Sequence, residues 1–256
     1  MNTIIASVFV FFLGLSVGSF LNVCIYRLPR GESIVNPPSR CPSCNARLGV
    51  LELVPILGYA LSRGRCRHCG VRISVQYPLV EAATAAVFVA LFLKFPSTVT
   101  VLSYMTLCSA LIALAVIDLN SMEVPDSVTV GAGALGAFFS FLKGELAGSL
   151  LGAAFGFSVL FLLARLARIV YGREAMGDGD AMIAAMIGAY TGMAGVSVSL
   201  LAAFLTGGLA GMFMLISGLK KLGQEVPFGP MIAAGAFVYI FFGEELTRWY
   251  ALLFRV

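Results

Sequence analysis

Long apolar stretches separated by short polar segments dominate this chain. The candidate membrane-spanning stretches cover residues 3–26, 78–94, 98–118, 124–142, 146–170, 180–193, 195–219 and 228–243. A helix needs about 20 predominantly apolar residues to cross a bilayer, whereas barrel strands are shorter and alternate polar with apolar positions. The pattern therefore predicts an all-α, polytopic membrane protein with about eight transmembrane helices. Residues 27–77 form a long polar loop after the first helix.

Composition supports the same class. Hydrophobic residues make up 59% of the chain and charged residues 12%, against about 45–50% and about 25% in soluble proteins. The first apolar stretch, Ile4 to Tyr26, has no basic region before it and no Ala-x-Ala-like cleavage site. We therefore expect a retained helix and not a cleaved signal peptide.

The distribution of Lys and Arg predicts the orientation. If the 27–77 loop is cytoplasmic, that side holds thirteen cations: Arg27, Arg30, Arg40, Arg47, Arg63, Arg65, Arg67, Arg72, Arg165, Arg168, Arg173, Lys220 and Lys221. The other side holds four: Lys94, Lys143, Arg248 and Arg255. By the positive-inside rule we expect both termini outside and the loop inside.

Two acids close to membrane segments are the candidate catalytic residues. Asp118 ends an apolar run, and Asp180 opens another as the last residue of Gly177-Asp178-Gly179-Asp180. The predicted topology brings both to the cytoplasmic surface. A negative charge is disfavoured at the C-terminal end of a helix, so Asp118 lacks the structural role that a helix start offers Asp126. We prefer Asp180 to Asp178 because it adjoins the apolar helix, and burial perturbs a carboxylate.

If Asp118 and Asp180 meet, like charges in a poorly solvated site disfavour ionisation of both. One acid then keeps its proton while the other activates water, which is the chemistry of an aspartic protease. Paired intramembrane acids also carry protons or ions in transporters, and a non-catalytic membrane scaffold is a further alternative. The chain lacks Gly- or Pro-interrupted helices in matching halves, which argues against a transporter.

The 27–77 loop predicts a metal site. It contains two Cys-x-x-Cys motifs, with 21 residues between Cys44 and Cys66, and the four candidate zinc ligands are Cys41, Cys44, Cys66 and Cys69. Two such turns supply four thiolates to one tetrahedral zinc ion. A pair of disulfides is the alternative, which a reducing cytoplasmic location disfavours. His68 lies inside the second motif, and we expect it to be no ligand because four Cys fill the coordination shell.

A few other positions have more than one interpretation. Gly18 is small enough to let another helix approach closely. The amide of Asn22 needs partners at its depth, and an interhelical contact or a substrate contact would supply them. Glu81 could pair with Arg72 or lie near the catalytic surface. We expect the motif at residues 226–230, Val-Pro-Phe-Gly-Pro, to form a rigid start of a helix.

These motifs, taken in order, resemble those of the bifunctional type IV prepilin peptidases of bacteria, polytopic aspartic proteases of the Gly-x-Gly-Asp type. The resemblance runs through nearly the whole chain, over these segments: Gly18-Ser19-Phe20-Leu21-Asn22, Tyr26-Arg27-Leu28-Pro29, the four Cys, Tyr77-Pro78-Leu79-Val80-Glu81, Ile117-Asp118, Pro125-Asp126 and Gly177-Asp178-Gly179-Asp180. It implies that Asp118 and Asp180 are the catalytic pair. One departure is Met182, where the family often has Lys.

The resemblance also implies two reactions and their partners. The first cuts the basic leader of a prepilin or pseudopilin after Gly, at the cytoplasmic face of the bacterial inner membrane. The second methylates the new N-terminus with S-adenosylmethionine. We expect membrane lipid but no nucleic acid as a further partner. An intramembrane aspartic protease without methyltransferase activity is the alternative within enzymes.

The expected organisation has three parts. Residues 1–26 form the first transmembrane helix, residues 27–77 the cytoplasmic zinc-binding loop, and residues 78–256 the membrane peptidase domain. The resemblance associates the loop with methyltransferase activity.

Overall fold

The computed structural model describes residues 2–172, 177–219 and 226–254. Four of the Lys and Arg residues used to predict the orientation lie outside these ranges: Arg173, Lys220, Lys221 and Arg255. Within the described ranges the chain is helical, and the β-structure found there consists of isolated bridges. Six of the described helices are long and apolar enough to cross a membrane, and Asp126–Leu142 is a shorter apolar helix. The expectation of an all-α, polytopic protein is therefore confirmed.

The chain divides into two compact units, residues 1–113 and 114–256. In the first unit, α1 (Asn2–Arg27) packs against α4 (Gln76–Lys94). The helices approach closely because α1 has glycines at the crossing: a Cβ at Gly14 would lie 2.6 Å from the Cα of Ala85, and one at Gly18 2.7 Å from the Cα of Glu81. The predicted close approach at Gly18 is thus present.

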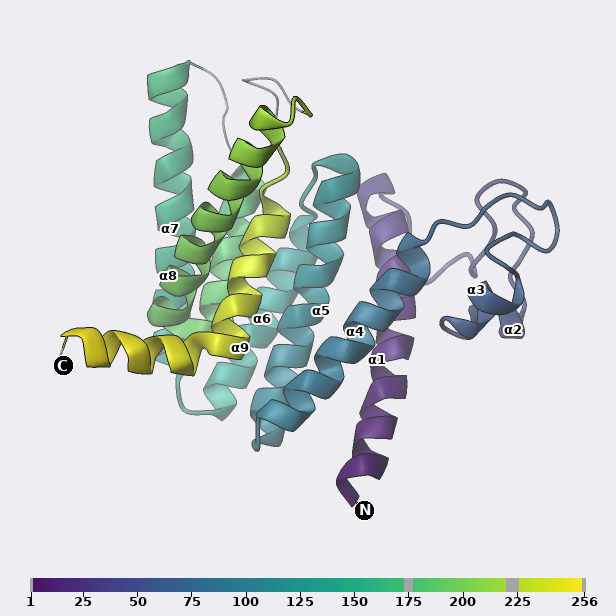
Figure 1. The fold of residues 1–256 in the computed structure, drawn as a ribbon, viewed down its shortest axis with the longest axis horizontal. Coiled ribbons are helices and arrows are strands. Elements are labelled where there is room, and N and C mark those ends of the chain that lie inside the picture. The colour runs from purple at the N-terminus through teal and green to yellow at the C-terminus, as the bar shows by residue number, and fades with distance from the viewer. Residues whose placement is uncertain (1, 173–176, 220–225, 255–256) are drawn as a thin grey trace. The chain divides into compact units, whose positions relative to one another are not determined.

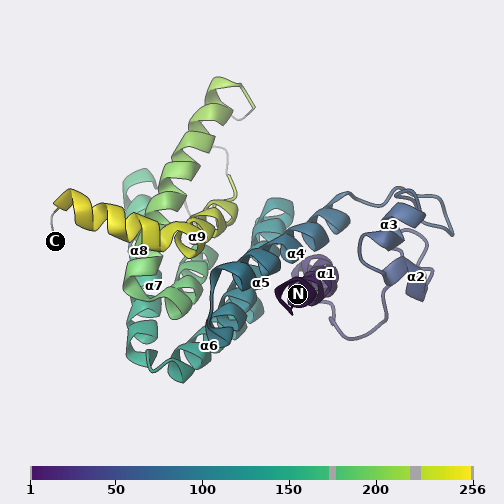
Figure 2. The same cartoon turned by 60° about the horizontal axis from the view of Figure 1, so that its bottom comes forward.

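The loop between α1 and α4 contains short helical turns and two knuckles. The turns are η1 (Leu28–Arg30), α2 (Val50–Leu53) and α3 (Leu57–Leu61). Figure 2 shows α2 and α3 in this loop, past the start of α4. The knuckles are closed by the antiparallel bridges Arg40↔Arg47 and Arg65↔Arg72. Helix α5 (Thr98–Ser121) then runs across the boundary into the second unit.

The second unit is arranged around α8 (Asp178–Ile216), which packs against three helices: α6 (Asp126–Leu142), α7 (Leu146–Tyr171) and α9 (Gly229–Phe254). Figure 1 shows α7, α8 and α9 together in this unit, with the C-terminal part of α9 turning away from its first part. Buried apolar side chains on α8, such as Ile183 and Ile187, form the core.

The predicted spans 180–193 and 195–219 correspond to one helix in the structure, α8, which has 39 residues and ends at Ile216. A helix of that length measures about 58 Å, more than the roughly 30 Å of a bilayer core. It breaks at Gly192, where φ is 67° and ψ is −172°. One turn before this break, the carbonyl of Ala189 accepts hydrogen bonds from the hydroxyls of Ser140 (3.1 Å) and Ser149 (2.6 Å). The break lies near the end of the first of these predicted spans, and the number of membrane crossings stays a prediction.

Candidate functional site

Asp118 lies in the last turn of α5, yet its side chain meets the start of another helix. The residue is 6% exposed, and its Oδ2 accepts a hydrogen bond of 2.8 Å from the backbone N–H of Gly229, the first residue of α9. The free N–H groups and the dipole at a helix N-terminus favour a negative charge. The end of α5 disfavours a carboxylate, and the start of α9 compensates for it.

The sequence analysis assigned Gly229 no role beyond a rigid helix start, whereas the structure places it against Asp118. A Cβ at this position would lie 2.7 Å from Oδ2 of Asp118 and 3.3 Å from its Cβ. The motif at residues 226–230 does begin a helix, as expected, but its glycine also makes room for the carboxylate. The glycine between Phe228 and Pro230 was the available signal, since a helix start does not by itself require Gly there.

Asp180 lies in the first turn of α8 and is 8% exposed, whereas Asp178 is exposed. The glycine between them permits a close contact, because a Cβ at Gly179 would lie 2.5 Å from the Cβ of Val124 in the α5–α6 link. The negative charge of Asp118 acts on the Asp180 carboxyl group. The second unit therefore brings together the two acids singled out in the sequence, while Asp126 is exposed at the start of α6.

Such an arrangement suits acid–base chemistry. Two buried carboxyl groups whose charges interact are less stable when both are ionised than when they share one proton. The pair can then offer an acid and a base at the same time, as hydrolysis of a peptide bond through an activated water requires. The proton belongs to the coupled pair and not to one named residue.

The four predicted zinc ligands also come together. The Sγ atoms of Cys41, Cys44, Cys66 and Cys69 all lie within 4.8 Å of one another, and those of Cys41 and Cys69 are 3.9 Å apart. Tetrahedral zinc with Zn–S bonds of about 2.3 Å needs sulfurs about 3.8 Å apart. All four cysteines are free thiols in the structure, which therefore does not contain the two disulfides considered as the alternative.

Backbone amides of the knuckles favour the thiolate form of two of these cysteines, Cys41 and Cys66. The N–H of Cys44 donates to Cys41 and lowers the pKa of the Cys41 thiol to about 7. The N–H groups of Cys69 and His68 lower the pKa of the Cys66 thiol in the same way. His68 acts here through its backbone, with an N–H to Sγ distance of 3.4 Å, and its ring is not part of the cluster. The donor set therefore fits a zinc ion held by four thiolates.

Asn22 and Glu81 find partners within the first unit. The Nδ2 of Asn22 donates to the carbonyl of Tyr77 on α4 at 3.0 Å, which supplies the interhelical contact. The Oε2 of Glu81 accepts a hydrogen bond of 2.7 Å from the N–H of Ile56 in the loop. Arg72, the partner considered for Glu81, forms no ion pair with it in the described part of the chain.

Comparison with known proteins agrees with these features. A family model described as the bacterial peptidase A24 N-terminal domain matches residues 12–95, and one described as the type IV leader peptidase family matches residues 105–212. A prepilin leader peptidase/N-methyltransferase of Aeromonas hydrophila is 34% identical over 94% of this chain and 92% of its own length. One from Bacillus subtilis (strain 168) is 34% identical over 94% of this chain and 96% of its own length.

A third relative of the same name, from Myxococcus xanthus, is 42% identical over 82% of this chain and 64% of its own length. No solved structure matches the chain. The sequence similarity over most of both chains is decisive: this protein belongs to the type IV leader peptidase family.

Proposed function

We propose that this protein cleaves the basic leader of type IV prepilins or pseudopilins after Gly and then N-methylates the new N-terminal residue. The observation that carries the proposal is the buried pair Asp118 and Asp180, whose charges interact in a chain of this family. The names of the relatives, which combine a leader peptidase with an N-methyltransferase, support the second reaction.

The cleavage proceeds by general acid–base catalysis. The ionised acid of the pair takes a proton from a water molecule as the water oxygen attacks the carbonyl carbon of the Gly. The protonated acid donates its proton to the carbonyl oxygen, which gives a tetrahedral diol. As the C–N bond breaks, the first acid passes the proton that it took from water to the leaving amine, and the diol returns a proton to the second acid as the carbonyl forms again. The N–H of Gly229 holds the Asp118 carboxylate in place through the reaction.

The site faces the cytoplasm in this proposal. A precursor with a basic head and an apolar stem keeps its head on the cytoplasmic side, and the charge distribution along this chain predicts that Asp118 and Asp180 lie on the same side. Substrate and acids then meet at the inner rim of the bilayer.

Zinc and S-adenosylmethionine are the proposed cofactors. Zinc is structural, because four Cys thiolates leave no open position for a substrate. S-adenosylmethionine supplies the methyl group to the amine that the cleavage releases. The relatives' names favour this bifunctional enzyme over an intramembrane protease without methylation, and over a scaffold or transporter.

The test combines purified protein with a synthetic prepilin peptide that carries its leader. Mass spectrometry is expected to show loss of the leader, and then gain of one methyl group when S-adenosylmethionine is present. Cleavage without methylation would favour the simpler protease, and absence of both reactions would reject the proposal.

The acids are tested by Asp118→Asn and Asp180→Asn. Each change removes an acid–base group, and we expect the cleavage rate to fall by about 10²–10⁴-fold. Asp178→Asn is the matched control, since it alters an exposed acid in the same turn of α8 and should leave cleavage near normal. Near-normal cleavage by either of the first two variants would reject the assignment.

A further inference from the structure

The short helices α2 and α3 of the zinc-binding loop carry an exposed apolar face. Its members, which we call the α2–α3 face, are Val50 (82% exposed), Leu51 (63%), Leu57 (57%) and Leu61 (63%). Single apolar residues are normal on a surface in water, but a cluster of large ones within residues 50–61 marks a contact with a partner. The position of this face within the first unit indicates what that partner is.

The α2–α3 segment lies beside the last turns of α1. The N–H of Ile56, between α2 and α3, donates to the Oε2 of Glu81 at 2.7 Å. Glu81 is in the second turn of α4, and a Cβ at Gly18 of α1 would lie 2.7 Å from its Cα. Gly18 is nine residues before Arg27, the last residue of α1, which corresponds to about 13 Å along the helix. Ile56 is therefore held alongside α1 and not past its end.

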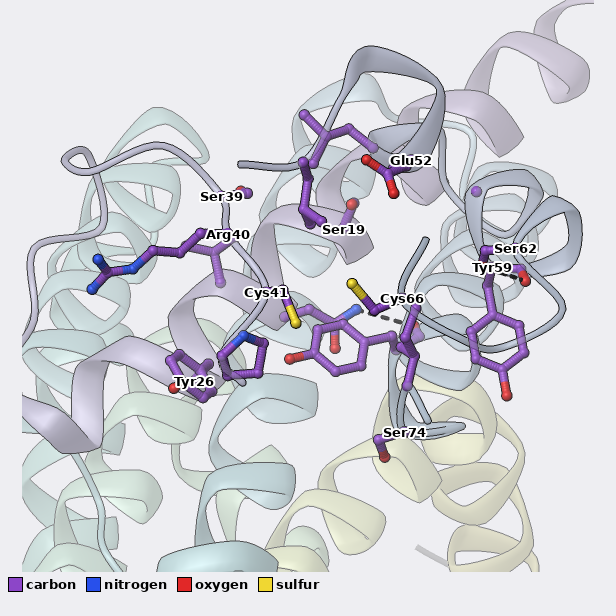
Figure 3. A pocket seen from close by; sticks show the side chains of 18 of the residues that line it. Ser19, Tyr26, Ser39, Arg40, Cys41, Glu52, Tyr59, Ser62, Cys66 and Ser74 are labelled. Atoms are coloured by element: carbon purple, nitrogen blue, oxygen red, sulfur yellow. Dashed lines mark hydrogen bonds between the residues drawn. The ribbon is translucent and has the colours of Figure 1, made fainter. Parts of the chain in front are cut away.

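A pocket of about 420 Å³ between the segment and the two helices marks the same level. Its lining residues on α1 include Ser19 and Tyr26, and those on the segment include Glu52 and Tyr59. Figure 3 shows Ser19 and Glu52 among the side chains around this pocket. No member of the α2–α3 face lines it. Other side chains of the segment thus face α1 across the pocket, and the apolar face is directed elsewhere.

The depth of this segment matches the membrane–water interface. Both α1 and α4 are long and apolar enough to cross a membrane. Tyr26 and Tyr77 lie near the ends that these helices have at the loop, and such positions are typical of aromatic rings at the interface. Ile56 bonds to α4 one turn beyond Tyr77. Apolar side chains that point away from the protein there meet lipid, as in amphipathic segments that lie about 5–10 Å into the headgroup boundary.

Arginines flank the apolar face. Arg47 precedes α2, and Arg63 and Arg65 follow α3. All three are exposed, and none forms an ion pair within the described ranges of the chain. Basic residues next to a membrane segment attract the anionic headgroups of the cytoplasmic leaflet. A lipid bilayer therefore offers an apolar layer for the face and negative charge for its edges.

We propose that the α2–α3 face inserts into the leaflet that surrounds the end of α1, which is the cytoplasmic leaflet in the predicted orientation. Its apolar side chains lie among the upper parts of the acyl chains, and Arg47, Arg63 and Arg65 lie at the headgroups. The hydrogen bond from Ile56 to Glu81 fixes the segment at this depth. The zinc-binding loop is then anchored to the membrane at its middle as well as at its two ends, independently of the reactions proposed above.

The experiment uses the full-length, zinc-loaded protein in vesicles of phosphatidylethanolamine and phosphatidylglycerol. Trp249 is the one tryptophan of the chain, so Trp249→Phe gives a background in which Leu51→Trp and Leu57→Trp each report a single position. Lipids with bromine atoms near the top of the acyl chains quench a Trp that touches them, whereas iodide quenches a Trp in water. Both variants are expected to lose about half of their fluorescence or more in brominated vesicles, because a depth of about 5–10 Å brings the ring to the bromines. Iodide should have little effect on either.

Two matched positions serve as controls. Phe20→Trp, at a half-exposed position of α1 level with the pocket, should be quenched by the brominated lipid. Val35→Trp changes another exposed apolar residue of the same loop, beyond the end of α1, where the guanidinium of Arg27 donates to the carbonyls of Ser33 (2.8 Å) and Pro37 (2.7 Å). It should respond to iodide and not to the brominated lipid. Zinc content and thermal unfolding show whether each variant is folded.

The pattern of quenching decides the partner of the face. Quenching of Leu51→Trp and Leu57→Trp by the brominated lipid alone supports insertion. Iodide quenching to the extent seen for Val35→Trp would place the face in water and overturn the inference. Protection from both quenchers would show that protein covers the face, and would equally reject lipid as its partner. Leader cleavage and methylation are measured separately, so failure here leaves the proposed function standing.

Discussion

At the scale of single residues, the position of the Asp118 carboxylate depends on the absence of a Cβ atom at Gly229. The glycine N–H donates to Oδ2 at 2.8 Å, and a Cβ on the same residue would lie 2.7 Å from that oxygen. A carbon cannot approach an oxygen that closely without movement. Either the carboxylate or the first turn of α9 must shift when this glycine is replaced.

We therefore predict that Gly229→Ala impairs leader cleavage while the protein still folds. Displacement of a catalytic group by a fraction of an ångström to 1 Å lowers kcat by about 10–100-fold, and the change should appear in kcat more than in KM. Gly211→Ala is the control, because a Cβ at Gly211 has no neighbour within 4 Å. Normal kcat in Gly229→Ala would show that the Asp118 carboxylate does not need this placement.

At the scale of elements, small residues decide how α7 and α8 cross. A Cβ at Gly188 would lie 2.1 Å from the carbonyl oxygen of Gly152, and a Cβ at Gly152 would lie 2.5 Å from the carbonyl oxygen of Gly188. The two backbones are thus in direct contact, the arrangement by which small residues let membrane helices pack. Next to Gly188, the carbonyl of Ala189 accepts hydrogen bonds from Ser149 on α7 and from Ser140 on α6.

Gly188→Ala is expected to destabilise the protein. The added methyl group has no space between the two backbones, and overpacking of this kind costs about 1–3 kcal/mol. Unfolding in mixed detergent micelles would measure the loss. Gly148→Ala, on α7 with no neighbour within 4 Å of its Cβ, should unfold as wild type does. Equal stability of the two variants would contradict the crossing described above.

The zinc-binding loop is the second element that yields a prediction. We expect one zinc ion per chain, lost in Cys41→Ser and retained in Cys108→Ser, since Cys108 is buried outside the cluster. Protons compete with the metal for thiolates. Because the pKa of Cys41 is lowered to about 7, its thiolate is present above that pH and is lost as the pH falls through it. Zinc retention should fall in the same direction, and unchanged metal content in Cys41→Ser would contradict the site.

At the scale of the whole molecule, the chain is a multi-pass protein of the bacterial inner membrane. Its two compact units each contain one of the sites: the cysteine cluster belongs to residues 1–113, and the two acids belong to residues 114–256.

The predicted orientation can be tested with reporter fusions. Alkaline phosphatase is active only outside the cytoplasm, so a fusion after Glu123, in the α5–α6 link, should be inactive, and one after Gly144, between α6 and α7, should be active. A green fluorescent protein fused at the same points should give the opposite pattern. Activity of the phosphatase after Glu123 would place the end of α5, and with it Asp118, on the outer face.

Local signals in the sequence were sufficient for the class of protein and for the choice of candidate site residues. Apolar length predicts membrane helices, because a bilayer imposes a minimum number of apolar residues on any helix that crosses it. Two Cys-x-x-Cys motifs predict the cluster, because each turn already places two sulfurs side by side. Asp118 and Asp180 stand out as carboxylates at the ends of apolar runs, where an unexplained charge is costly.

Contacts between distant segments were decided only by the tertiary structure. The hydrogen bond from Gly229 to Asp118 joins residues 111 positions apart, and the link from Asn22 to Tyr77 joins residues 55 apart. No short pattern encodes such pairs, since they depend on which helices pack together and in what register. The break at Gly192 inside α8 likewise became visible only in the tertiary structure.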